Sequence, residues 1–170
     1  FAQMGSAKDI AKIQAKAAES AAAARQAAAP SCFMDGTMVR MADNSVKAIE
    51  SIQLGDELTT GLVLSVSQHL ADGQDLYTLG KSRMTGNHIV LVNDIYIPVM
   101  YVGDYTPEVG IVIVYDLIVE GTHRIELEDG LFTMDQDGFN YDAQAMADTL
   151  NEIEGRNTHE LTEVVSAGEV

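Results

Sequence analysis

The sequence predicts an all-β domain with a helical segment at each end. Between residues 37 and 134, short runs rich in β-branched and aromatic residues alternate with turn residues, a pattern typical of antiparallel strands. Residues 7–29 hold twelve alanines in 23 positions, and alanine has the highest helix propensity. Residues 141–154 carry apolar residues at the spacing of an amphipathic helix. We therefore expect three parts: an Ala-rich helical segment over residues 1–31, a β-domain over 32–135, and an acidic helical or mobile tail over 136–170.

The alanine-rich helix is expected to end before Pro30, because proline removes a backbone donor and restricts the residue before it. Small and apolar residues recur along it at three- and four-residue steps, at Ile10, Ile13, Ala17, Ser20, Ala24 and Ala27. This seam would let the helix pack against another helix or against further copies of the chain, which would give a homo-oligomer. A helical spacer without a packing partner is the second interpretation. The chain begins with Phe1 rather than Met, so we expect it to be a fragment of a longer protein. Residues 1–31 would then be the end of an upstream protein that is joined to the β-domain.

The strands are expected in a regular order along the middle of the chain. A first strand over residues 37–41 turns at residues 42–45 into a second over 46–48, and residues 49–54 form a short turn. Asp72-Gly73 and Asp129-Gly130 are expected to be hairpin turns, since Asp-Gly suits tight turns. The C-terminal helix is expected to end at Gly155 and to be followed by a mobile tail. The remaining strands are expected over residues 57–69, 75–80, 88–92, 96–99, 111–119, 123–127 and 131–134.

The charge of the chain excludes some classes of partner. The net charge is −16, and residues 126–170 alone hold 12 acidic residues against one arginine. Nucleic acids and anionic membranes need a basic surface, so we expect neither as a partner. No segment resembles a signal peptide or a transmembrane helix, and the sequence does not indicate the cellular compartment of the protein.

Metal and cofactor sites are not expected either. The single cysteine excludes an internal disulfide, and with two histidines and no close ligand pair it is a weak signal for zinc. Aspartates over residues 35–75 lack the regular spacing of a calcium loop. His69 and His159 are expected to be solvated or structural.

Cys32 is the most informative residue for chemistry. A lone cysteine is usually a small buried hydrophobe, but Cys32 follows Pro30-Ser31, which should run extended and present the Ser31 carbonyl to a side chain. A thiolate attacking that carbonyl would convert the Ser31–Cys32 peptide bond into a thioester. This step needs a site for the oxyanion and a proton donor for the departing amine, and a histidine would suit the second role.

Two further motifs supply candidates for these roles. Residues 85–88 read Thr-Gly-Asn-His, a T-x-x-H motif that is weak alone. The β-branched run of residues 111–123 contains Asp116 and ends at His123. Burying a carboxyl group costs free energy, so an acid inside such an apolar run indicates a specific role for Asp116.

Together the three blocks resemble the hedgehog/intein (Hint) autoprocessing domains. Residues 32–39 with Gly55-Asp56, residues 85–88 and residues 114–123 occur in the order of that family, and the resemblance spans residues 32–135. It implies a twisted, horseshoe-like β-fold. It also implies that Cys32 performs an N-to-S acyl shift, and that Thr85 and His88 strain the scissile amide and protonate the departing nitrogen. Asp116 and His123 would assist proton transfer.

The chain departs from the splicing members of that family at the end of the domain. Splicing inteins end in His-Asn followed by Cys, Ser or Thr, whereas this chain has Met134-Asp135 followed by Gln136. Aspartate cyclises less readily than asparagine, methionine cannot replace the imidazole, and glutamine offers no nucleophile. The resemblance therefore implies a bacterial intein-like type without the C-terminal His-Asn, which cleaves at its amino end and does not ligate. The 26 residues between His88 and Tyr115 are too few for a homing endonuclease.

The resemblance therefore implies self-cleavage at Ser31–Cys32, a single-turnover reaction. Its substrate is the chain's own upstream segment, and water or a small thiol resolves the thioester. The alternative is a degenerate Hint fold that serves as a structural or interaction module on an oligomeric, fibre-like assembly. A cysteine peptidase acting on other proteins is disfavoured, because the nucleophile lies at its own cleavage junction.

Overall fold

The computed structural model describes residues 31–168, without the side chains of residues 140, 141, 143 and 157–168. The expected helix over residues 7–29, with its packing seam and the homo-oligomer inferred from it, lies outside the described residues. Short 3-10 helices occur at η1 (Ile49–Ser51), η2 (Gly73–Asp75) and η3 (Val99–Tyr101), and the α-helices are α2 (Gly138–Tyr141) and α3 (Ala143–Gly168). The strands are β1 (Phe33–Met34), β2 (Met38–Arg40), β3 (Val46–Ala48), β4 (Glu57–Leu58), β5 (Gly61–Asp72), β6 (Leu76–Leu79), β7 (Ser82–Thr85), β8 (Ile89–Val92), β9 (Ile95–Pro98), β10 (Asp104–Tyr105), β11 (Ile111–Val119), β12 (Arg124–Glu126) and β13 (Phe132–Met134).

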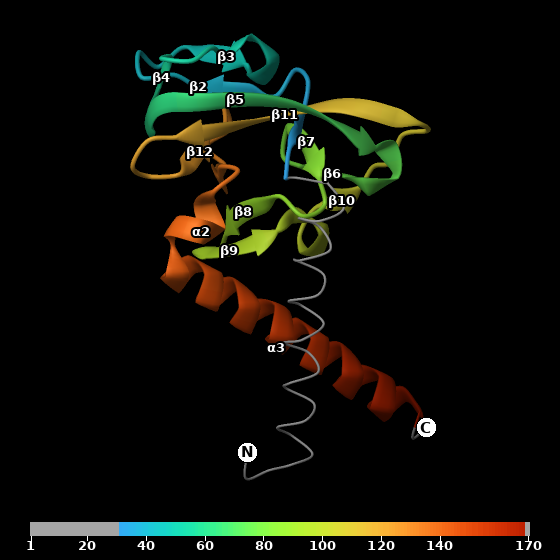
Figure 1. Ribbon diagram of the computed structural model, residues 1–170. Helices are drawn as coiled ribbons and strands as arrows, with labels where there is room; N and C mark the ends of the chain where they lie inside the picture. Colours follow the sequence, from blue (N-terminus) through green and yellow to red (C-terminus); the bar gives the residue numbers. More distant parts are fainter. Residues whose placement is uncertain (1–30, 169–170) are drawn as a thin grey trace.

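The larger sheet places β1 between two longer strands. Its order is β10-β6-β7-β1-β11-β5-β4, and its strands pair antiparallel. β5 and β11 run side by side across the upper part of the molecule (Figure 1). β11 is rich in Ile and Val, which favour extended backbone, and its register with β5 shifts between Ile118 and Val119. The chain therefore enters the domain in the middle of a sheet, beside the acid-containing strand.

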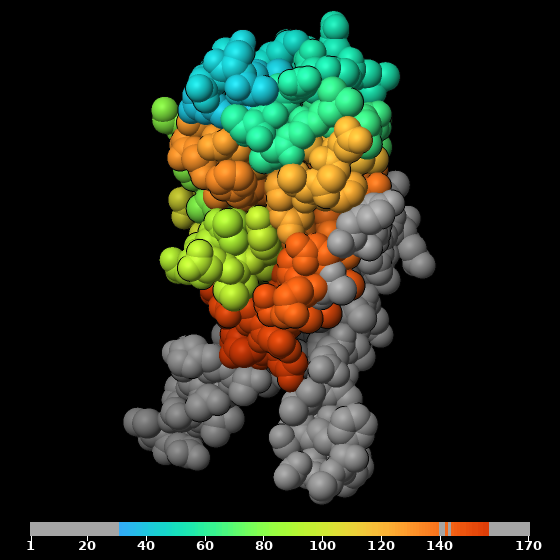
Figure 2. Space-filling model, turned by 90° about the vertical axis from the view of Figure 1, so that its left-hand side faces the viewer, coloured from blue at the N-terminus to red at the C-terminus, as the bar shows by residue number. Residues whose placement is uncertain are grey.

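The second sheet, of order β12-β13-β8-β9, lies below the first and rests on α3 (Figure 1). Ile89 and Met134 pack with Ala145 of α3 in a small apolar cluster. The Thr149 hydroxyl donates a hydrogen bond to the Tyr96 carbonyl, which ties the helix to β9. Figure 2 shows this stacking from the side, with the β8–β9 hairpin between the strands above and the first turns of α3 below. β2 and β3 form a separate two-stranded sheet.

One main apolar core fills the space enclosed by the strands. Phe33 of β1, the residue directly after Cys32, is completely buried in this core. Burying a phenylalanine side chain contributes about 2–3 kcal/mol to the free energy of unfolding. The buried members are Phe33, Val39, Met41, Ile49, Ile52, Leu58, Val63, Met84, Val90, Ile97, Val99, Leu117, Val119, Ile125 and Leu127.

The all-β prediction is confirmed, and the differences concern individual elements. The Asp129-Gly130 turn joins β12 and β13, which pair as expected. Asp72-Gly73 does not form a hairpin, because β5 pairs with β11 and β4 while β6 pairs with β7 and β10. The Asp72 carboxylate instead accepts a hydrogen bond from the Gln74 amide and caps η2. The strand expected over residues 57–69 is divided into β4 and β5 by a turn, and β1, β7 and β10 were not expected.

The C-terminal helix is longer than the sequence indicated. We expected it to end at Gly155, but α3 continues through that residue to Gly168. A glycine inside a helix costs about 1 kcal/mol relative to alanine and does not by itself end the helix. Glu152 and Arg156 form an ion pair across Gly155, which favours continuation. Within residues 31–168, no helix combines the length and the apolar character needed to cross a membrane.

His69, expected to be solvated or structural, is partly enclosed by the sheet. It is half-buried on β5 opposite Val114, and its Nε2 is a buried atom that makes no hydrogen bond with the described residues. It is therefore not a fully solvated histidine. The side chain of His159 lies outside the described residues.

Candidate functional site

Cys32 is fully buried at the start of β1, between β7 and β11. Phe33 lies opposite Met84 of β7 on one side and Tyr115 of β11 on the other. Continuing the β1–β11 register by one residue places Cys32 opposite Asp116. The β-pairing therefore brings Cys32, the end of β7 and the buried Asp116 to the same part of the sheet.

Thr85, the last residue of β7, holds the nitrogen of the Ser31–Cys32 bond. Its Oγ1 accepts a hydrogen bond from the Cys32 amide at 3.0 Å, and its own amide donates to the Cys32 carbonyl at 2.9 Å. The Thr85 hydroxyl in turn donates to Oδ1 of Asn87 at 2.8 Å. This bond orients a lone pair of the hydroxyl toward the Cys32 N–H. Asn87 was not singled out in the sequence, although it lies inside the T-x-x-H motif.

His88 is fully buried and packs against Phe33, the residue that follows Cys32. Its ring centroid lies 4.0 Å from that of Phe33. Nε2 is 3.1 Å from the Met134 carbonyl oxygen, which can only accept, so Nε2 carries a proton. Burial lowers the pKa of His88 from 6.5 to about 3, against the opposing effect of the Met134 carbonyl. His88 is therefore neutral near pH 7, and its Nδ1 is a buried, unprotonated nitrogen without a hydrogen-bond partner among the described residues.

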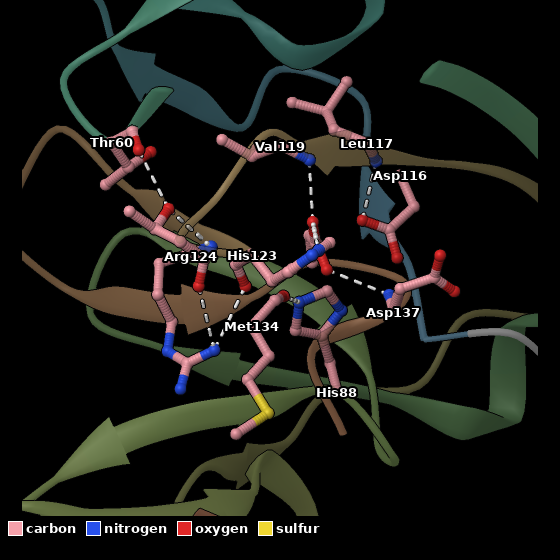
Figure 3. A network of polar contacts seen from close by, with 11 residues as sticks. Thr60, His88, Asp116, Leu117, Val119, His123, Arg124, Met134 and Asp137 are labelled. Carbon is pink, nitrogen blue, oxygen red and sulfur yellow. Dashed lines mark hydrogen bonds and ion pairs between the residues drawn. The ribbon is translucent and has the colours of Figure 1, made fainter. Parts of the chain in front are cut away.

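Asp116 is fully buried on β11 and is stabilised in its neutral form. Its Oδ1 accepts from the Leu117 amide at 2.7 Å, while Oδ2 has no hydrogen-bond partner of good geometry within residues 31–168 (Figure 3). Burial raises the pKa of Asp116 well above its usual value, and the carboxylates of Asp135 and Asp137 raise it further. The Leu117 amide and a weak interaction with the Ser31 side chain lower this pKa only in part. Burial also raises the pKa of the Cys32 thiol, and a negative charge on Asp116 would raise it further.

His123 joins this group through Asp135. It lies at the end of the turn after β11 with φ of +53°, a left-handed conformation that is unusual for a bulky residue. Its Nδ1 is 3.0 Å from Oδ2 of Asp135, and its carbonyl accepts from the Asp135 amide at 2.9 Å. The structure thus brings Cys32 together with Thr85 and Asp116 and packs His88 on Phe33. His123 joins them indirectly, through its contact with Asp135.

Asp135 is almost completely buried, and both of its carboxylate oxygens are engaged. Oδ2 accepts from the Val119 amide at 2.7 Å as well as from His123, and Oδ1 accepts from the Asp137 amide at 2.9 Å. The sequence marked this position only as one where the asparagine of splicing proteins is missing. Its role as a buried acceptor depends on contacts between β11 and β13 that the sequence pattern does not show.

A metal centre is not supported by the arrangement of side chains. In the described part of the chain, no three or more His, Cys, Asp or Glu residues are grouped so that they could hold a metal ion.

Replacing Asp116 with asparagine should change how stability depends on pH. Because the folded state raises the pKa of Asp116, the folded protein holds a proton that the unfolded chain releases above about pH 3.8. The free energy of unfolding should then fall as pH rises, by up to about 1.4 kcal/mol per pH unit, until the folded-state pKa is passed. Asp116→Asn should remove this dependence. Denaturant unfolding of both proteins at several pH values above 6.5 tests it, and parallel curves would show that Asp116 ionises normally.

Comparison with known proteins identifies the fold. No family model matches the chain, and no curated protein shows significant sequence similarity to it. The solution structure of a bacterial intein-like domain from Clostridium thermocellum superimposes with a TM-score of 0.52 and 20% sequence identity, covering 61% of this chain and 97% of that chain. The chain has an intein-like Hint fold.

The likeness at this level of identity establishes the fold and leaves the activity to be argued from the site. The residues expected from the Hint resemblance, Cys32, Thr85, His88, Asp116 and His123, are all described by the structure and belong to one connected region.

Proposed function

We propose that this Hint domain cleaves its own chain at the Ser31–Cys32 bond. The observation that carries the proposal is the hydrogen bond from the Cys32 amide to Thr85 Oγ1, at 3.0 Å. This amide nitrogen is the leaving group of an N-to-S acyl shift, and a residue that holds it can twist the peptide bond out of conjugation with its carbonyl. The buried acid Asp116, opposite Cys32 on β11, and the neutral His88, which packs on Phe33, are the proton-transfer groups of this proposal.

The proposed step conserves atoms and protons. The Cys32 thiol gives its proton to the unprotonated Nδ1 of His88, and the sulfur forms a bond to the Ser31 carbonyl carbon. The bond from that carbon to the Cys32 nitrogen then breaks. The protonated Nδ1 of His88 returns its proton to the departing nitrogen, which becomes the amine of Cys32. The product is a thioester between Ser31 and the Cys32 sulfur, isomeric with the starting peptide.

Asp116 assists this exchange in its neutral form. A charged carboxylate beside Cys32 would oppose the negative charge that develops on sulfur and on the Ser31 carbonyl oxygen. With its pKa raised by burial, the carboxyl group keeps a proton that it can share with a developing oxyanion. His123 enters the proposal through proton transfer when the thioester is resolved.

Cleavage is completed when water or a small thiol attacks the thioester, which releases residues 1–31 from residues 32–170. Millimolar dithiothreitol or hydroxylamine should accelerate release, because each is a better nucleophile than water toward an activated acyl group. Mass spectrometry of the chain incubated with and without the nucleophile measures this. Rates that do not change with thiol would argue against an accumulating thioester. A product that joins residues upstream of 32 to residues downstream of 135 would contradict the absence of splicing.

The second candidate is a Hint fold kept as a structural or interaction module. Its supporting observation is the complete burial of Cys32, which raises the pKa of the thiol and disfavours the reactive thiolate. A chain that stays intact in dithiothreitol and hydroxylamine would favour this candidate over self-cleavage.

A further inference from the structure

The two candidate histidines are held by two adjacent residues, Met134 and Asp135. The Met134 carbonyl accepts from Nε2 of His88 at 3.1 Å, and the Asp135 carboxylate contacts Nδ1 of His123 at 3.0 Å. Figure 3 shows both imidazoles turned toward this end of β13. The pair that takes the place of the His-Asn of splicing inteins is therefore also the pair that contacts both histidines.

These contacts fix opposite tautomers on the two rings. The carbonyl oxygen of Met134 has no proton to give, so His88 carries its proton on Nε2. Asp135 already accepts backbone N–H groups from Val119 at Oδ2 and from Asp137 at Oδ1, so it acts as an acceptor and His123 carries a proton on Nδ1. Neutral His88 thus has its unprotonated nitrogen at Nδ1, and neutral His123 at Nε2.

The surroundings of both residues indicate that this arrangement is firmly held. Met134 is buried, and a Cβ added at Gly138 would lie 2.7 Å from the Met134 Cβ, so the start of α2 packs closely against it. His123 keeps its left-handed backbone while tied to Asp135 through both its ring and its carbonyl. Strained backbone persists where the surrounding contacts over-determine it, and it often marks functional positions.

We infer that Asp135 is a positioning residue, which fixes the tautomer of His123 while the neighbouring Met134 carbonyl fixes that of His88. In this chain the end of β13 orients proton-transfer groups instead of releasing the segment that follows it. The expected effect of Asp135 on the cleavage rate rests on the proposed function, whereas the expected tautomers of the two histidines do not depend on it. Because the Asp135 carboxylate is saturated by backbone and His123 contacts, substituting asparagine should not create a carboxy-terminal cleavage site.

Two substitutions at Asp135 separate positioning from general stability. Asp135→Ala removes both carboxylate oxygens, so His123 should lose the preference for Nδ1–H and move toward the Nε2–H form. Asp135→Asn keeps one oxygen, which can still accept from Val119 and His123 if the amide nitrogen faces Asp137. It should therefore preserve the Nδ1–H form of His123. Asp129→Asn makes the same chemical change at an exposed site at the other end of the β12–β13 hairpin and serves as the matched control.

The tautomers are read by long-range proton–nitrogen NMR of the full chain, labelled at histidine and carrying Cys32→Ala so that it stays intact. We expect Nε2–H for His88 and Nδ1–H for His123 near neutral pH, with the His123 signals changed by Asp135→Ala and not by Asp129→Asn. His88 should be unchanged in all variants. An Nε2–H form of His123 in the unsubstituted background would overturn the inference, and so would an Asp135→Ala spectrum with His123 unaltered.

Cleavage rates in the Cys32 background form the second readout. Supporting hydrogen bonds to functional histidines in metal sites are worth roughly 10–100-fold in activity, and we expect a loss of similar size for Asp135→Ala with rescue by Asp135→Asn. Equal rates in both variants would contradict positioning. If the unsubstituted chain does not cleave but shows the expected tautomers, the proposed function fails and the positioning role stands. If Asp135→Ala does not fold, Asp135→Asn still tests the positioning role. A changed His123 tautomer in Asp135→Asn would contradict that role, and so would a fragment that ends at residue 135.

Discussion

Replacing Cys32 with alanine is expected to abolish cleavage while the fold stays intact. Alanine removes the sulfur that we propose attacks the Ser31 carbonyl, and the described residues include no second cysteine. The side chain that is lost is small and completely buried, so we expect a loss of stability of about 1 kcal/mol. Circular dichroism and intact mass after prolonged incubation with thiol measure the fold and the cleavage separately.

Cys32→Ser is the matched control for this substitution. A hydroxyl is a much weaker nucleophile than a thiolate, so the serine variant should cleave far more slowly than the unsubstituted chain but by the same route. A fragment that begins at residue 32 in the alanine variant would show that an external protease cuts the chain, and the acyl shift would then be wrong.

Removing the imidazole of His88 is expected to have the second largest effect. His88→Gln keeps a side chain of similar size against Phe33 but removes the Nδ1 nitrogen that we propose takes the thiol proton. General acid–base catalysis contributes about 10²–10⁴-fold, so thioester formation should slow by that factor. Trapping the acyl group with hydroxylamine and following the released segment by mass gives the rate. A rate within a factor of about two of the unsubstituted chain would make His88 a structural residue, since that lies far below the range for proton-transfer groups.

The same substitution should alter stability at low pH. The folded state lowers the pKa of His88 to about 3, so between about pH 6.5 and 3 the unfolded chain binds a proton that the folded protein does not. The free energy of unfolding should therefore fall as pH decreases through this range, by about 2–3 kcal/mol between pH 6.5 and pH 4.5 from this group alone. His88→Gln should lose correspondingly less. Denaturant unfolding in the Cys32→Ala background compares the two, and equal losses would show that His88 is protonated in the folded protein.

The sequence pointed to those members of the candidate site that depend on residue type and local order. Cys32 was recognisable from Pro30-Ser31 before it, and Asp116 because an acid inside a β-branched run is unusual. Their proximity needed the sheet, since it is the β1–β11 pairing that places residue 32 beside residue 116. The long-range hydrogen bonds that complete the site join residues 46 and 12 positions apart, at His88–Met134 and His123–Asp135, and no local pattern encodes them.

The errors in the predicted fold have the same origin. Asp72-Gly73 has the residue types of a hairpin turn. Whether the two flanking strands pair also depends on the other strands that are available, and β5 pairs with β11 instead of β6. Gly155 resembles a helix end, yet its neighbours favour helix strongly enough to continue α3. β1 and β10 have two residues each, too short for any periodicity to reveal them.

The intact mass of the freshly purified 170-residue chain, followed over time in dithiothreitol, tests self-cleavage most directly. We expect the mass of the whole chain to decline while two species grow, residues 32–170 with a free amine on Cys32 and residues 1–31 carrying the thiol or, after hydrolysis, a carboxyl group. No species should end at residue 135. A single unchanged mass after prolonged incubation at neutral pH would contradict self-cleavage and leave the Hint fold of this chain as a structural or interaction module.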